Sequence, residues 1–157
     1  MKKAQSSLEY LMTYGWAILI LVVALAIIVY VGLVDPQSNA PNSLVLPSGF
    51  SAYSYGVRGN RLMLDLGQAT GKTITVTGIV CTQNETASEV TNLNVQIPSG
   101  QHRMVTDYDS NFTCTCPGAT PGALYKGFVF LWYDRPNSNV PHMVQGELTY
   151  YVEYDVS

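Results

Sequence analysis

The longest apolar stretch of this chain lies near its beginning. From Tyr10 to Val34 there is no charged residue and no proline. Residues 18–23 read Ile-Leu-Ile-Leu-Val-Val, so a helix formed here is apolar on every side and needs lipid or a protein bundle around it. At a rise of about 1.5 Å per residue, this stretch could cross a hydrocarbon core of about 30 Å. We therefore predict a continuous hydrophobic helix over residues 5–34.

The periodicity changes after Val34. Asp35 and Pro36 end the helix, and the polar turn-forming residues that follow predict a linker over residues 35–43. Beyond the linker, short segments with alternating apolar and polar positions, or with many β-branched residues, predict strands near 61–66, 73–81, 93–97, 126–133 and 148–154. The segment 126–133 is apolar on both faces, as a central strand would be. We predict the α+β class, in which the long N-terminal hydrophobic α-helix precedes an antiparallel β-sandwich head domain over residues 44–157.

Charge narrows the range of functions. Only 12% of the 157 residues are charged, and the formal net charge is −3. A chain that is acidic and poor in lysine and arginine is a poor candidate for binding nucleic acid. Lys2 and Lys3 precede the apolar stretch, and basic residues hold such an end in the cytoplasm, which places the C-terminal domain outside the cell.

Residues 2–10, Lys-Lys-Ala-Gln-Ser-Ser-Leu-Glu-Tyr, resemble the class III signal peptide of archaeal type IV pilin-like proteins. Residues 11–19 are also similar to this family, and the resemblance extends over about residues 1–34. It implies that a prepilin peptidase cuts between Ala4 and Gln5. Residues 1–4 would then be the signal peptide, and Gln5 would begin the mature chain.

Glu9 is a carboxylate at the head of the apolar helix, where it needs a partner or becomes neutral. Cleavage would create an α-amine at Gln5, one turn away on the same face. The resemblance implies that Glu9 pairs with the N-terminus of a neighbouring subunit and helps to set the axial register of a filament. Alternatively, Glu9 is solvated at the helix start, with Ser6 or Ser7 as N-cap. Cyclisation of Gln5 would remove the amine.

The predicted external domain carries two kinds of modification site. A disulfide from Cys81 to either Cys114 or Cys116 fits an oxidising compartment and leaves one thiol over. Asn84 and Asn111 each begin an Asn-x-Thr sequon, and both are candidates for N-glycosylation.

The chain offers no convincing set of catalytic or metal-binding residues. Asp107-Tyr-Asp-Ser-Asn111 imitates the start of a calcium loop, but Phe112 occupies the position of the required glycine. His102 and His142 form no zinc motif, and no phosphate-binding glycine loop is present. We therefore expect neither an enzyme nor a cofactor.

The resemblance implies the major structural subunit of an extracellular archaeal type IV pilus-like filament, polymerising through its N-terminal helix for adhesion or cell contact. The implied partners are copies of the chain in a helical filament, a prepilin peptidase, an assembly ATPase and a membrane platform protein. The precursor would lie in the cytoplasmic membrane, with its C-terminal domain outside, before assembly.

Two alternatives remain open. The first is a minor pilin or membrane-tethered ligand-binding β-domain, which would show an exposed aromatic cleft. The second is a secreted β-domain freed by signal peptidase, with a mature N-terminus near Pro41.

Overall fold

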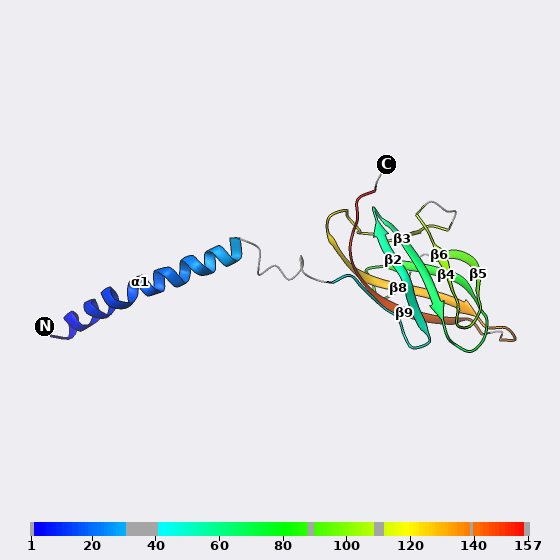
Figure 1. Cartoon of the computed structure of the whole chain (residues 1–157), viewed down its shortest axis with the longest axis horizontal. Helices are drawn as coiled ribbons and strands as arrows, with labels where there is room; N and C mark the ends of the chain where they lie inside the picture. The colour runs from blue at the N-terminus through cyan, green and yellow to red at the C-terminus, as the bar shows by residue number, and fades with distance from the viewer. Residues whose placement is uncertain (1, 31–40, 88–89, 109–111, 139, 156–157) are drawn as a thin grey trace. The chain divides into compact units, whose positions relative to one another are not determined.

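A computed structural model describes residues 2–30, 41–87, 90–108, 112–138 and 140–155. The chain divides into two compact units, Met1–Asn39 and Ala40–Ser157. The first unit contains helix α1 (Lys2–Tyr30), whose side chains are described at Met12 and from Tyr14 to Tyr30. The second unit is built from nine strands in its described part, and Figure 1 shows how they are arranged.

The helix corrects the predicted fold class. Among the residues described with their side chains, no helix is both long enough and apolar enough to cross a membrane. A span takes about 20 consecutive apolar residues, and the described run from Tyr14 to Tyr30 is shorter than that. The prediction of the α+β class with a long, membrane-length N-terminal helix is therefore wrong. The described chain is mostly antiparallel β, with α1 as its one helix.

A five-stranded antiparallel sheet forms one layer of the second unit. Its strand order is β1-β9-β8-β4-β5. The strands are β1 (Ser43–Val45), β9 (His142–Tyr151), β8 (Leu124–Asp134), β4 (Ile74–Thr82) and β5 (Thr91–Ile97). The apolar strand β8 therefore lies at the centre of the sheet, where both of its edges are paired.

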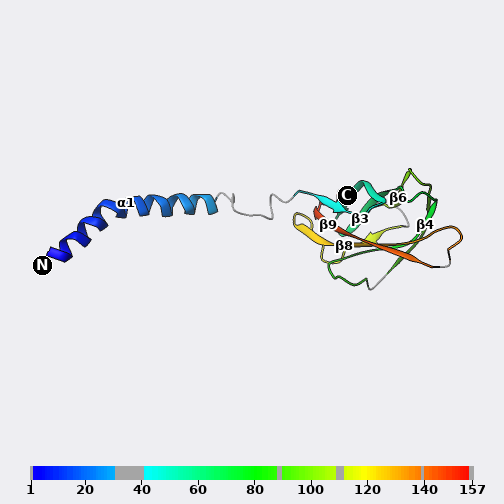
Figure 2. The same cartoon turned by 90° about the horizontal axis from the view of Figure 1, so that it is seen from below.

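The second layer is a four-stranded sheet. Strand β3 (Arg61–Gln68) pairs with β2 (Phe50–Arg58) along one edge. Its other edge is shared by β6 (His102–Thr106) and the short β7 (Cys114–Thr115). Figure 2 shows β3 and β8 in separate layers, so the sandwich part of the prediction fits this unit.

The hydrophobic core lies between the two sheets. Leu62, Leu64 and Leu66, the alternating leucines of β3, are fully buried in it. Leu93 and Ile97 of β5 face the same core. Alternation places every second side chain of a strand on one face, so these apolar side chains are removed from water on folding.

The structure has four strands in segments where we predicted none, namely β1, β2, β6 and β7. Strand β1 starts at Ser43, the last residue of the predicted linker. The neighbouring Asn42 accepts a hydrogen bond from the Tyr151 amide at 2.8 Å and one from the Tyr55 hydroxyl at 3.1 Å. These contacts tie the residue before β1 to β2, the next strand, and to β9, the last one described.

Candidate functional site

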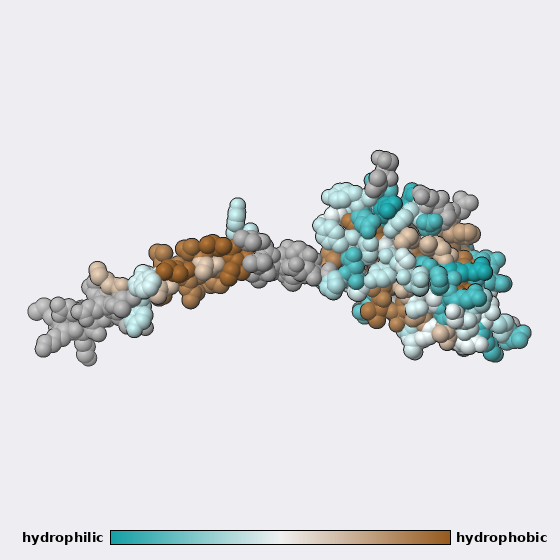
Figure 3. Space-filling model, viewed as in Figure 1, coloured by the Kyte–Doolittle hydropathy of each residue, from teal (hydrophilic) through white to brown (hydrophobic). Residues whose placement is uncertain are grey.

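The described surface of α1 is apolar on all sides. Its consecutive residues from Ile18 to Val23 are between 49% and 63% exposed. Six successive positions complete more than one helical turn, so no polar face remains among them. Figure 3 shows hydrophobic residues over the side of this stretch that it presents. In water, a surface of this kind requires a covering partner.

The predicted cleavage and assembly residues lie at the start of the same helix. Ala4, Gln5 and Glu9 belong to the backbone of α1, but their side chains lie outside the described part of the structure. The cut before Gln5 and the pairing of Glu9 therefore stay predictions. Asn111, the second sequon, also lies outside the described residues.

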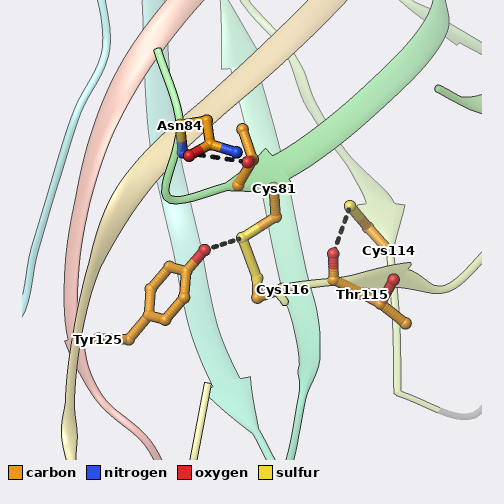
Figure 4. The surroundings of a disulfide bond; sticks show 7 residues. Cys81, Asn84, Cys114, Thr115, Cys116 and Tyr125 are labelled. Carbon is orange, nitrogen blue, oxygen red and sulfur yellow. Dashed lines mark hydrogen bonds between the residues drawn. A yellow bond between two sulfur atoms is a disulfide. The ribbon is translucent and has the colours of Figure 1, made fainter. Parts of the chain in front are cut away.

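The structure joins Cys81 to Cys116, with a Cα–Cα distance of 4.8 Å. Cys81 lies on β4 in one sheet, and Cys116 follows β7 in the other, so the disulfide links the two layers. The Tyr125 hydroxyl donates a hydrogen bond to Cys81 Sγ at 3.5 Å (Figure 4). Closing a loop with a sequence separation of 35 contributes about 4 kcal/mol in the chain-entropy model.

Cys114 remains a free thiol beside this disulfide. Its side chain is 1% exposed, and it lines a cavity of about 180 Å³ together with Val80, Val90 and Pro117. Burial raises the pKa of Cys114 to about 11, although a hydrogen bond from the Cys81 backbone acts in the opposite direction. The thiol is therefore neutral at ordinary pH and a poor nucleophile.

The first sequon is placed where a glycan could be attached. Asn84 lies in a bend directly after β4, and Asn84, Glu85 and Thr86 are all exposed. The Asn84 amide donates to Thr82 Oγ1 at 3.1 Å, which holds the backbone of the bend (Figure 4). The exposed Asn84 side chain leaves space for a bulky sugar, so this candidate stays open.

In the acidic segment that imitates a calcium loop, the first carboxylate forms a hydrogen bond with the neighbouring backbone. Asp107 Oδ1 accepts a hydrogen bond from the Tyr108 amide at 2.7 Å. Across the described residues, no three His, Cys, Asp or Glu side chains gather as metal ligands would.

A cluster around Tyr108 connects Glu153, which follows β9, to the four-stranded sheet. The Arg58 guanidinium lies 4.6 Å from the centre of the Tyr108 ring and 3.8 Å from the Glu153 carboxylate. The Tyr150 hydroxyl donates to the same carboxylate at 2.8 Å. Burial, followed by the hydrogen bond and charge of Glu153, raises the pKa of Tyr150 to about 12. This cluster has a structural role, because Arg58, Tyr108, Tyr150 and Glu153 contact one another, although Arg58 Nε is buried without a hydrogen-bond partner among the described residues.

Sequence reasoning missed an aromatic cluster on the four-stranded sheet. The rings of Tyr53 and His102 stack with their centres 4.0 Å apart, and His102 Nδ1 is 2.9 Å from the Asp65 carboxylate. His102 and Asp65 are 37 positions apart in the sequence, so no local motif connects them. A tyrosine between serines, Tyr53, was the available sequence signal, and its exposure comes from the structure.

Comparison of the chain with protein-family models, curated proteins and solved structures gave no match.

Proposed function

We propose that this chain is a structural subunit of an extracellular archaeal type IV pilus-like filament, assembled from copies of itself through α1. The observation that supports this most is the exposed apolar surface on all sides of the described helix. Identical helices packed together would remove that surface from water, with a gain of about 25 cal/mol for each Å² buried.

The resemblance of residues 2–10 to the class III signal peptide supports the same proposal. It adds a cut before Gln5, which would leave the helix attached to the mature subunit. The head domain would then cover the outside of the filament. A contact between identical subunits that does not close on itself generates a helical polymer.

The roles of the peptidase, the assembly ATPase, the platform protein and the membrane remain predictions from this resemblance. So does the choice of adhesion or cell contact as the purpose of the filament.

The decisive experiment is to determine the mature N-terminus by mass spectrometry and to examine shed material by electron microscopy. We expect Gln5 at the N-terminus and abundant filaments. A retained Met1 would contradict the proposed processing, and a terminus beyond Ala40 would support the secreted β-domain instead.

A substitution tests the assembly contact directly. We expect Glu9→Gln to leave the amount of processed chain unchanged and to reduce filament yield at least about tenfold, because an unpaired partner charge in an apolar bundle costs several kcal/mol. Glu85→Gln, which changes an exposed carboxylate of the head domain, is the matched control and should assemble normally. Normal filament yield from Glu9→Gln would show that the pairing is unnecessary.

A further inference from the structure

The aromatic ring of Tyr53 stands out on the surface because of a local irregularity in β2. The register between β2 and β3 shifts between Ala52 and Ser54, so Tyr53 is the extra residue of a β-bulge. Bulges re-aim a side chain and occur often beside functional sites. The Tyr53 side chain is 72% exposed, so its ring is accessible to a ligand.

Neighbouring side chains hold this exposed ring in place. It stacks on the His102 ring at 4.0 Å with an angle of 12° between the two planes. His102 Nδ1 lies 2.9 Å and 3.1 Å from the two oxygens of Asp65, whose side chain is 13% exposed. Tyr53 therefore presents a pre-oriented aromatic surface, and a ligand that packs on it loses little of the protein's conformational entropy.

The ring forms one wall of a groove of about 300 Å³ on the four-stranded sheet. The groove is lined by Ser51, Tyr53, Gly67, Gln68, Ala69, Gly100, Gln101 and His102. A Cβ atom added at Gly67 would lie 2.6 Å from Ser51 Oγ, so glycine at this position leaves room for the serine hydroxyl. The lining thus combines one aromatic wall with small residues and side chains that form hydrogen bonds.

The chemistry of the lining restricts the ligand. It contains no Lys, Arg, Asp or Glu among the described residues, so His102, which contacts Asp65, is the one lining side chain that can carry a charge. Gln68 is already used, because its Nε2 donates to the carbonyl oxygens of Lys72 and Ile97, both at 2.9 Å. The Ser51 hydroxyl, the Gln101 amide and His102 Nε2 remain as polar groups for a ligand.

We propose that this groove binds a neutral pyranose sugar, with the sugar ring stacked on the face of Tyr53 that His102 does not cover. The C–H groups on one face of a pyranose carry partial positive charge and are attracted to the negative face of an aromatic ring. Its hydroxyl groups both donate and accept hydrogen bonds, which matches a serine, an amide and an imidazole. Polysaccharides on other cell surfaces present such rings.

Sugar binding does not depend on filament assembly, because every residue of the groove belongs to the unit Ala40–Ser157. The two proposals can therefore fail separately. If both hold, the groove would let a filament attach to glycan-coated surfaces.

The test is to titrate the full-length chain, in a detergent that contains no sugar, with neutral gluco-, galacto- and manno-disaccharides. Saturation-transfer NMR would report the contact with the sugar ring. We expect millimolar or tighter binding of at least one disaccharide. Tyr53→Ala should weaken it by about tenfold, whereas Tyr53→Phe should keep it within about threefold because the ring remains.

Tyr154→Ala is the matched control, since Tyr154 is 69% exposed and does not line the groove. It should bind as the native chain does. Choline is the second probe, because quaternary ammonium groups also pack on aromatic faces. The proposal is overturned if no disaccharide binds at about 10 mM, if Tyr53→Ala binds as well as the native chain, or if choline binds more tightly than every sugar.

Discussion

Cys114 carries an ionisable group that folding almost completely encloses. Its side chain is 1% exposed, and Tyr125, whose ring lies near it, also has a pKa raised to about 12 by burial and by the Cys114 charge. The Cys114 charge therefore favours the neutral form of Tyr125. The region around the disulfide is uncharged as long as both groups keep their protons.

The shifted pKa of Cys114 predicts how stability depends on pH. The folded protein holds this proton up to a pKa of about 11, whereas the unfolded chain releases it near 9. The stabilisation is therefore complete below pH 9 and is lost as the pH rises through about 11. We expect the free energy of unfolding to fall by about 2 kcal/mol over this range because of Cys114.

Denaturant titrations at a series of pH values check this expectation. Cys114→Ala should show a smaller fall than the native protein between about pH 9 and 11, because the variant has no thiol to ionise. Tyr150 titrates in both proteins, whereas the pKa of Tyr125 is less raised in the variant, so the difference between the two proteins reports the Cys114 thiol together with its effect on Tyr125. Equal falls in the two proteins would contradict the assigned pKa.

Among the elements, β8 is apolar on both faces although only one face meets the core. Val129, Leu131 and Tyr133 belong to the core cluster. On the opposite face, Phe130 is 2% exposed without belonging to that cluster, and it pairs with Val80 of β4 across the sheet. Side chains of the neighbouring strands thus cover the outer face of β8, which is possible only at the centre of a sheet.

Gly127 on β8 provides a test of this close packing. A Cβ atom there would lie 2.5 Å from the Thr82 carbonyl oxygen and 2.8 Å from the Tyr125 ring. We expect Gly127→Ala to destabilise the protein by about 2 kcal/mol and to lower the melting temperature of the head unit by about 8 °C, measured by circular dichroism.

The control is Gly15→Ala in α1, where an added Cβ meets nothing within 4 Å. It should leave the melting of the head unit unchanged. If Gly127→Ala melted with the native protein, the approach of Thr82 and Tyr125 to this glycine would be looser than the structure describes.

At the scale of the whole molecule, the two units differ in how far their apolar side chains are removed from water. The unit Ala40–Ser157 encloses its own core between two sheets and links them through Cys81 and Cys116. The described part of α1 leaves its apolar side chains exposed. One unit is therefore complete by itself, whereas the other needs a partner.

This difference predicts the behaviour of the head unit alone. We expect a fragment of residues 40–157 to unfold in a single cooperative transition, to keep the disulfide and to remain monomeric, because all the core residues lie within it. Analytical ultracentrifugation and electron microscopy would check this. Filaments formed by the fragment would contradict the assembly role of α1.

The sequence by itself determined the strands whose apolar positions alternate. Leu62, Leu64 and Leu66 lie in the core because a period of two places them on one face whatever surrounds the strand. The apolar character of residues 18–23 could also be predicted, since it depends on composition alone. The inferred membrane length of the helix was wrong, because no helix among the described residues is long and apolar enough to cross a membrane.

Only the tertiary structure decided which groups meet across the sheets. Cys114 and Cys116 are two positions apart, and the choice between them as partner of Cys81 depends on how β7 approaches β4. The stacking of Tyr53 on His102 requires a bulge in one strand and a partner two strands away. Register and bulges arise from the packing of whole strands, so contacts that depend on them cannot be deduced from local sequence.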